Sequence, residues 1–240
     1  MLEILYQDDN MVAINKPSGL LVHRSMIDKY ETQFALQQTR DQIGQRVYPV
    51  HRLDKPTSGV LLFALNSEAA RKLTEQFTER VVVKNYLAVV RGHTQEQETI
   101  DYALKEEYDK MTDRNIDKNK TAQSAITAYT RLQTIELDYP TGRYQTSRYS
   151  LLSLQPKTGR KHQLRRHMKH ISHHIIGDTT HGDGKHNQLF RDKFDCHRLL
   201  LHSNSLQLTH PYTGENLIIN APLNDDLKRL FLAVGLVSSS

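Results

Sequence analysis

Short runs of apolar residues, separated by turn-forming residues, recur along the whole chain. The continuous apolar run at residues 60–65 predicts a buried strand, and the β-branched and aromatic content of residues 81–91 predicts a central strand. Similar patterns predict further strands at residues 4–6, 11–15, 125–137, 144–154, 199–201, 206–208 and 217–219, with turns at residues 16–19, 139–142 and 211–214.

Apolar residues at helical spacing are less frequent than the strand patterns. Ala69, Leu73 and Phe77 alternate with charged residues and predict an amphipathic helix over residues 67–80. Leu164, Met168 and Ile171 are spaced for one face of a second helix. Two more helices are predicted at residues 30–42 and 223–234, a polar surface loop at 105–121 and a frayed end at 238–240.

The order of these elements indicates the fold class. Many strands, few helices and no regular strand–helix alternation favour an α+β fold with a large, mostly antiparallel sheet. Because the strand pattern starts almost at residue 1 and continues along the chain, we expect one domain over residues 1–240.

Composition narrows the class of protein further. The one cysteine, Cys196, excludes an internal disulfide and favours a reducing compartment. The N-terminus lacks the pattern of a signal peptide and no apolar stretch approaches membrane-spanning length, so we expect a cytoplasmic protein with no membrane partner. A net charge of +5 and a pI near 9.2 permit a polyanionic partner without requiring one.

The segment at residues 51–59, HRLDKPTSG, is the strongest candidate for chemistry. It places the carboxylate of Asp54 among cationic and turn-forming residues, directly before the predicted buried strand. A buried charge must be paired, and enzymes accept that cost at active sites. The alternative is a structural turn in which Asp54 forms an ordinary ion pair.

Two further segments carry candidate site residues. Tyr86 lies on a predicted strand and offers a flat face and a hydroxyl group, although a plain core tyrosine is the alternative. Arg165 follows the TGR segment at residues 158–160, and an arginine facing an aspartate would keep that aspartate ionised despite desolvation. Beyond it, Arg166 and Lys169 form either a solvated helix face or a phosphate-contacting surface.

The histidines do not form a recognisable metal-binding pattern. Seven of them lie in the segment 162–186, but no HExxH or paired CxxC motif is present. We therefore expect no metal and no cofactor. Cys196 is expected to be a small buried residue, because no activating arrangement surrounds it.

Five ordered segments resemble the motifs of RluA-type pseudouridine synthases. These segments are KPSGL at residues 16–20, HRLDKPTSG at 51–59, KNYLA at 84–88, PKTGRKHQLR at 156–165 and HRLLLH at 197–202. The turn GDTTHG at residues 177–182 is similar to a further family element, in which the glycines shape a loop. The resemblance covers almost the whole chain. RluA-type proteins often carry a small RNA-binding domain before the catalytic one, and because the strand pattern here starts almost at residue 1, we expect a single catalytic domain without it.

This resemblance implies specific roles. In the family, the aspartate at the position of Asp54 is the catalytic nucleophile and the tyrosine at Tyr86 stacks on the target uracil. The position of Arg165 pairs with the aspartate, and that of Leu164 packs beneath the uracil. Arg52 would fill the gap left by the flipped nucleotide. We expect His51, Arg160, Arg166 and Lys169 to contact the substrate as well.

The resemblance also implies a mixed sheet with a central catalytic cleft and an RNA substrate. The short chain and the segment at residues 181–187 are similar to the branch that modifies uridine-65 at the end of the T stem of tRNA. Ribosomal RNA is the alternative substrate, and a basic RNA-binding module without catalysis or a hydrolytic N-glycosidase are alternative functions. A monomer is expected.

Overall fold

The computed structural model describes residues 1–23, 32–107 and 121–236. Its main feature is a ten-stranded sheet with the order β1-β2-β4-β9-β5-β8-β7-β6, in which β3 also pairs with β4 and β10 also pairs with β9. The strands are β1 (Glu3–Gln7), β2 (Met11–Lys16), β3 (Tyr48–Pro49), β4 (Ser58–Ala64), β5 (Val83–Arg91), β6 (Gln97–Asp101), β7 (Ile126–Leu137), β8 (Ser147–Pro156), β9 (Leu201–Thr209) and β10 (Asn216–Asn220).

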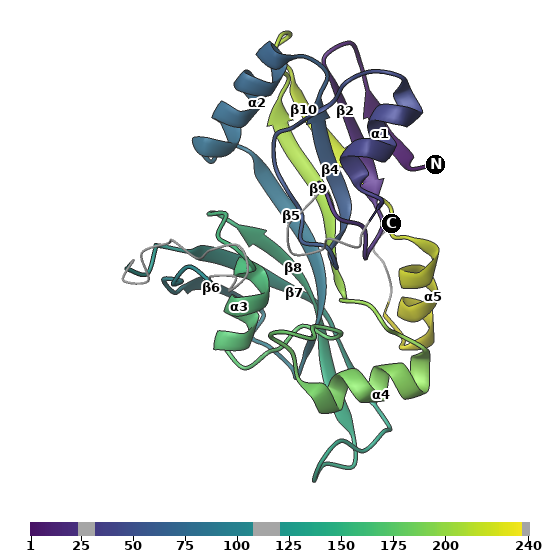
Figure 1. Cartoon of the computed structure of the whole chain (residues 1–240). Coiled ribbons are helices and arrows are strands. Elements are labelled where there is room, and N and C mark those ends of the chain that lie inside the picture. The colour runs from purple at the N-terminus through teal and green to yellow at the C-terminus, as the bar shows by residue number, and fades with distance from the viewer. Residues whose placement is uncertain (24–31, 108–120, 237–240) are drawn as a thin grey trace.

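Five helices lie against the sheet among the described residues. They are α1 (Ala35–Ile43), α2 (Ser67–Thr78), α3 (Gln163–His170), α4 (Gly184–Phe194) and α5 (Asp225–Ala233). Figure 1 shows α1 and α2 beside the part of the sheet that contains β2 and β4, and α3 and α4 beside the part that contains β7 and β8. None of the described helices combines the length and the apolar character needed to cross a membrane.

The centre of the sheet joins these two parts. Strand β4 is buried along its whole length, as its continuous apolar run predicted. It pairs antiparallel with β2 and β3 and parallel with β9 at Ser58↔His202 and Gly59↔Ser203, whereas the other pairs are antiparallel. The predicted α+β class with a mostly antiparallel sheet is therefore confirmed.

Helix α3 is held on the sheet by its apolar face. Leu164 and Met168 are buried in one cluster with residues of β5 and β8, and Ile171 packs partly buried against the same cluster. The spacing of these three residues follows the helical period, so burial of this face is what stabilises the helix on the sheet. This packing fixes the direction of Arg165, which lies on the same helix.

The sequence pattern did not predict several elements, and it placed the boundaries of others differently from the structure. Strand β6 is an exposed edge strand in which only Ile100 is buried, so it lacks the apolar alternation that predicts a strand. Helix α4 and the two-residue strand β3 were also missed. Two strands were predicted at 199–201 and 206–208, but the structure has one strand, β9, which begins at Leu201 and continues through the polar residues 202–205. In this polar part His202 contacts Ser58 Oγ and the Ala221 carbonyl.

Other boundaries moved by a few residues. The helix predicted at 30–42 begins only at Ala35, because Phe34 is extended and bridges to Leu21. The strand predicted from residue 144 begins at Ser147. Most of the loop predicted at 105–121 and the frayed end predicted at 238–240 lie outside the described residues.

Candidate active site

A pocket of about 740 Å³ lies where the HRLDKPTSG segment, β5 and the start of α3 meet. Its lining includes every candidate site residue from the sequence except Arg166 and Lys169. The candidates that line it are His51, Arg52, Asp54, Tyr86, Arg160, Leu164 and Arg165. Segments that are far apart in the sequence therefore form one cavity.

Asp54 stands at the strand-entry turn. Its backbone carbonyl accepts a hydrogen bond from Thr57 N–H at 3.0 Å, which closes a turn over Lys55 and Pro56. The Asp54 side chain is 23% exposed, and its Oδ2 lies 3.4 Å from Nη1 of Arg165. The carboxylate is thus partly desolvated but retains access to the pocket.

The buried Lys16 holds this turn in place through hydrogen bonds to backbone carbonyl groups. The Nζ of Lys16 donates hydrogen bonds to the carbonyl oxygens of Pro17, Leu20 and Lys55, at 2.9, 2.7 and 3.1 Å. Burial lowers the pKa of Lys16 to about 7, with Arg198 acting in the same direction and the charge of Asp54 opposing the shift. The KPSGL segment therefore holds the HRLDKPTSG segment in place.

The strand that follows the turn is fixed by the HRLLLH segment. Ser58 Oγ contacts Nδ1 of His202 at 2.8 Å and accepts a hydrogen bond from Arg198. His202 Nε2 also contacts the carbonyl oxygen of Ala221 at 3.1 Å, and burial lowers the pKa of this histidine to about 4. Because the imidazole is neutral at neutral pH, it can link Ser58 to the Ala221 carbonyl through hydrogen bonds.

Arg165 makes its strongest contacts with a residue that sequence reasoning missed. Its Nε and Nη2 donate to the two carboxylate oxygens of Asp178 at 2.7 and 2.8 Å, whereas Nη1 reaches Asp54 at 3.4 Å. Arg165 and Asp178 side chains are only 5% and 1% exposed. The predicted contact between Arg165 and Asp54 is present, but the bidentate partner is Asp178.

Hydrogen bonds and charge stabilise the ionised forms of Arg165 and Asp178. Burial opposes ionisation of Arg165, but hydrogen bonds and charge from Asp178, with a contribution from Asp54, raise the Arg165 pKa above its ordinary value. Burial likewise opposes ionisation of Asp178, yet hydrogen bonds from Arg165 and from the backbone N–H groups of His181 and Thr180 hold its pKa below the ordinary value. A fixed positive charge therefore faces Asp54.

Tyr86 and His51 line the same cavity with neutral rings. Burial raises the pKa of Tyr86 to about 12, although its hydroxyl hydrogen bonds with Ser203. His51 Nε2 accepts the N–H of Leu62 at 2.9 Å, the ring stacks on Phe77 at 4.8 Å, and burial lowers the His51 pKa to about 3. Nε2 of His51 is thus engaged internally as an acceptor, which leaves Nδ1 and the ring face for other contacts.

The TGR segment is organised by one glutamine. Gln163 Oε1 accepts from Thr158 Oγ1 and Arg160 N–H at 2.8 and 3.0 Å, and its Nε2 donates to the Ile126 carbonyl and Thr127 Oγ1. These contacts fix the first turn of α3, and Leu164, which is 7% exposed, lies on the pocket wall.

The remaining basic candidates are placed differently. Arg160 lines the pocket and its Nε donates to the Ser124 carbonyl at 3.1 Å. Arg166 pairs with Glu107 at 3.3 Å and does not line the pocket. Lys169 is exposed on α3. Of these two, Lys169 is the more accessible to a polyanion.

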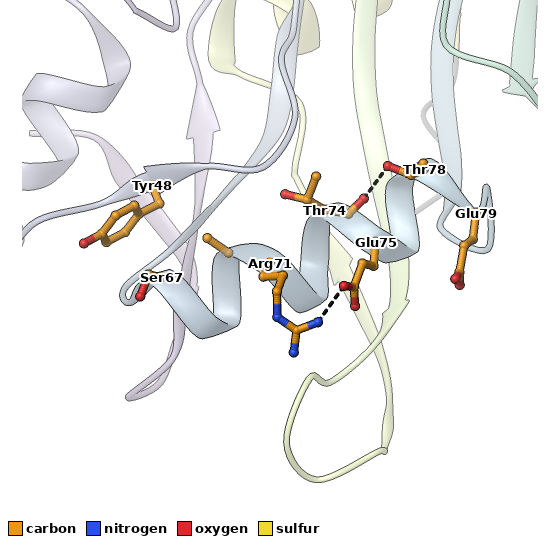
Figure 2. A pocket seen from close by; sticks show the side chains of 8 residues that line it. Tyr48, Ser67, Arg71, Thr74, Glu75, Thr78 and Glu79 are labelled. Atoms are coloured by element: carbon orange, nitrogen blue, oxygen red, sulfur yellow. Dashed lines mark hydrogen bonds and ion pairs between the residues drawn. The ribbon is translucent and has the colours of Figure 1, made fainter.

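A second pocket lies beside α2, and its lining contains no comparable group of candidate catalytic residues. It measures about 530 Å³, and its ionic contact is the pair Arg71–Glu75 at 2.6 Å, one turn apart (Figure 2). An exposed pair of this kind contributes little and leaves no reactive group oriented. The candidate active site is therefore the pocket at Asp54, where a carboxylate, a buried arginine, an aromatic ring and an apolar wall converge.

Comparisons with known proteins identify the family to which the chain is similar. The family described as RNA pseudouridylate synthase matches residues 10–170, which include Asp54, Tyr86 and Arg165. The chain is 56% identical over 230 residues to "tRNA pseudouridine synthase C" of Vibrio parahaemolyticus, covering 96% of this chain and 94% of the relative. It is 55% identical to the protein of the same name from Haemophilus influenzae, with 98% of both chains covered.

A solved structure supports the fold at greater evolutionary distance. Human RNA Pseudouridylate Synthase Domain Containing 4 superposes with a TM-score of 0.73 at 26% identity, covering 99% of this chain and 95% of the human chain.

Proposed function

The chain belongs to the RNA pseudouridylate synthase family, and from this premise we propose that it converts one uridine of tRNA to pseudouridine. The tRNA assignment is supported by relatives named tRNA pseudouridine synthase C, which are 55–56% identical over nearly their full lengths. We propose uridine-65, at the end of the T stem, because the sequence resembles the branch that modifies this position. Such an enzyme would act in the cytoplasm, as the single cysteine also suggests.

The reaction is an isomerisation. The N-glycosidic bond of the uridine breaks, the released base rotates, and a carbon–carbon bond forms between C5 of the base and C1′ of the same ribose, while the C5 proton leaves and N1 takes up a proton. The proposed chemistry has no net oxidation or reduction and requires a nucleophile or base beside the sugar and a surface that retains the base. Asp54 is the candidate for the first role, since its carboxylate is partly desolvated and faces the pocket.

The other pocket residues would hold the flipped base, the RNA and the Asp54 side chain. The base must leave the helix stack to reach Asp54, and flipped bases are held by stacking and apolar contacts. Tyr86 and Leu164 provide such a surface, and the high pKa of Tyr86 keeps its hydroxyl protonated at neutral pH. Arg52, exposed at the pocket rim, is placed to occupy the gap in the RNA. Arg165 contacts the Asp54 carboxylate through Nη1 and so helps to orient it.

The observation that carries this proposal is the contact between Arg165 and Asp54 inside the pocket, at 3.4 Å. Replacing Asp54 by Asn preserves shape but removes the nucleophile, so Asp54→Asn should abolish turnover while tRNA binding and folding are retained. Tritium release from labelled uridine in tRNA measures the turnover. Activity within about tenfold of the wild type, roughly 1.4 kcal/mol of barrier, would refute the role of Asp54.

The substrate is tested separately. Pseudouridine is mapped in total RNA from cells with and without the gene, and the purified protein is offered full-length tRNA and large-subunit rRNA fragments. Loss of one tRNA site supports the proposal. Efficient modification of rRNA with tRNA untouched would favour the ribosomal alternative, and release of free uracil would indicate an N-glycosidase. Binding without either reaction would indicate a non-catalytic module.

A further inference from the structure

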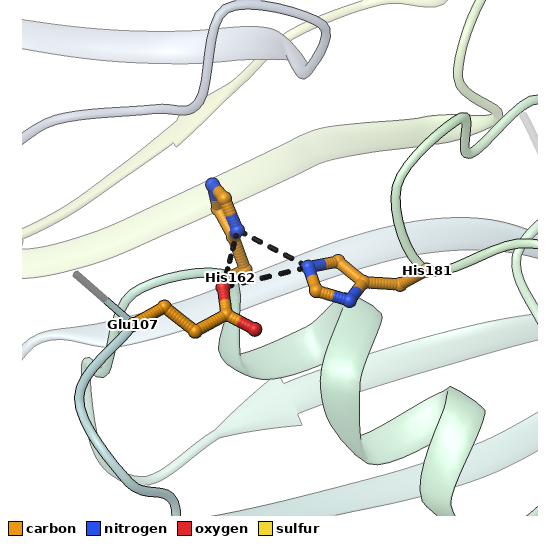
Figure 3. Close-up of side chains that lie close together, drawn as sticks. All are labelled: Glu107, His162 and His181. Carbon is orange, nitrogen blue, oxygen red and sulfur yellow. Dashed lines mark hydrogen bonds and ion pairs between the residues drawn. The ribbon is translucent and has the colours of Figure 1, made fainter. Parts of the chain in front are cut away.

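Three potential metal ligands converge beside the pocket, and they come from segments far apart in the sequence. Glu107 follows β6, His162 precedes α3, and His181 lies in the turn that contains Asp178 (Figure 3). His162 Nδ1 lies 3.1 Å from Glu107 Oε2 and 3.2 Å from His181 Nε2, and His181 Nε2 lies 3.6 Å from Glu107 Oε2. Among the described residues, these three side chains bring their potential ligand atoms within 4.8 Å of one another.

The three facing atoms can act as acceptors together. In the neutral tautomers that carry their hydrogen on the other ring nitrogen, His162 Nδ1 and His181 Nε2 present lone pairs beside Glu107 Oε2. A hydrogen on His162 Nδ1, shared between its two neighbours, also satisfies these contacts, whereas a cation between the three atoms would be attracted to all of them.

The distances correspond to one face of a tetrahedral shell. Zinc binds imidazole nitrogen and carboxylate oxygen at about 2.0–2.2 Å, which places neighbouring ligand atoms of a tetrahedron roughly 3.3–3.6 Å apart. The separations of 3.1, 3.2 and 3.6 Å in the structure are close to that range. Three protein ligands of this type leave a fourth position for water or another oxygen ligand.

Neighbouring groups contact two of the three ligands. Arg166 Nε lies 3.3 Å from Glu107 Oε1, the second oxygen of that carboxylate. A hydrogen-bonding partner of this kind fixes the direction of a ligating carboxylate in metal sites. The backbone of His181 is held on both sides, because its N–H donates to Asp178 and its carbonyl contacts His174 Nδ1 at 2.7 Å.

We propose that Glu107, His162 and His181 form a binding site for a divalent transition metal of the zinc class. The sequence pattern did not predict it, because two histidines nineteen positions apart and a distant glutamate make no local motif. The ion would link the start of α3 to the turn that holds Asp178 and so stiffen the frame around Arg165. The site is independent of the proposed function, since isomerisation requires no metal.

The test measures bound metal and not catalysis. Zinc is titrated calorimetrically into the metal-free full-length protein, and cobalt replaces zinc so that its visible spectrum reports tetrahedral coordination. Removing a metal's outer contacts weakens affinity about 10–100-fold, so loss of a ligand in Glu107→Gln or His181→Gln should weaken zinc binding at least tenfold. His197→Gln is the matched control, because His197 pairs with Asp195 at 3.0 Å on the surface.

The expected result is one zinc ion per chain and a higher melting temperature in zinc, both lost in Glu107→Gln and kept in His197→Gln. Since His181 is buried, its variant could lose stability for other reasons, and the partly exposed Glu107 provides the second, milder variant. The proposal is wrong if zinc does not bind stoichiometrically, or if both ligand variants bind it as the wild type does. Adventitious binding to other histidines would give this second outcome.

Discussion

At the scale of single residues, Arg165 is shared between two carboxylates with different environments. Asp178 is buried and binds two nitrogens of the guanidinium, whereas Asp54 is more exposed and contacts the third. A planar guanidinium bound in this bidentate way cannot rotate freely. We therefore propose that Asp178 is a positioning residue, which directs Nη1 of Arg165 towards the proposed nucleophile.

Replacing Asp178 by Asn should impair both catalysis and stability. One buried charge loses its main partner, which costs about 3–5 kcal/mol of unfolding free energy. Turnover should fall strongly with a small change in KM, because Asp54 and the stacking surface remain. The folded-state pKa of Asp178 lies below its ordinary value, so its stabilisation is present at neutral pH and is lost as the pH falls through that lowered value. The variant should lack this part of the acid dependence.

Chemical denaturation at several pH values and steady-state kinetics on tRNA measure these effects. Asp183→Asn is a suitable control, since Asp183 is partly buried and, like Asp178, pairs with an arginine: Arg91, at 2.9 Å, outside the pocket. If Asp178→Asn loses stability but keeps the wild-type kcat, Asp178 supports the fold only and does not position Arg165.

The sequence predicted the candidate catalytic residues but not the residues that hold them in position. Asp54, Tyr86 and Arg165 lie in motifs with distinctive local patterns, and the structure brings all three to one pocket. Asp178 lies in a glycine-bounded turn, and no local pattern indicates which carboxylate an arginine thirteen positions earlier will bind. The same applies to Lys16, whose three carbonyl partners depend on the fold of two segments.

At the scale of elements, the active-site turn depends on a close approach between β4 and β9. Gly59 has a φ of 110°, and a Cβ atom placed there would lie 2.2 Å from the carbonyl oxygen of Ser203. That oxygen belongs to the neighbouring strand of the buried, parallel pair, so it cannot move away without disturbing the sheet. Glycine at this position thus lets β4 approach β9 directly after the turn that contains Asp54.

Gly59→Ala should therefore destabilise the protein by more than about 2 kcal/mol, through backbone strain plus steric overlap. Gly44→Ala separates the two causes. Gly44 also has a positive φ, 72°, but no atom lies within 4 Å of the position that a Cβ atom would take there. This control should cost only about 1 kcal/mol. Urea denaturation measures both variants, and equal losses would show that the approach of β9 is unimportant.

Prediction of elements succeeded where burial imposed a pattern. The apolar run of β4 and the periodic face of α2 predicted both elements, although β4 begins two residues earlier than the run, at Ser58. The pattern failed for β6, which is largely exposed, and for α4, where charged and polar residues separate Leu189 and Phe190 from other buried positions. It also split β9, because His202 and Ser203 are polar yet buried, and His202 is held there by hydrogen bonds.

At the scale of the whole molecule, the net charge of +5 is a poor guide to RNA contacts, because many cations already have carboxylate partners. Arg91, Arg165, Arg166 and Arg198 all form ion pairs. Lys169, in contrast, is exposed on α3, the helix that begins at the pocket wall. Cations of this kind attract the RNA backbone without reading its sequence, so specificity should come from RNA shape around the flipped uridine.

Simultaneous replacement of Arg166 and Lys169 by Ala should weaken tRNA binding and flatten its dependence on salt, without moving the modified uridine. Removing one cation that binds a phosphate lowers the slope of log K against log salt by about one unit. Lys169→Ala alone should account for most of the change, because Arg166 is engaged with Glu107. Lys228→Ala is the control: Lys228 is exposed on α5, which lies on the other side of the molecule from α3 in Figure 1. Filter binding at several salt concentrations measures the slopes, and an unchanged slope in the double variant would place the RNA on a different surface.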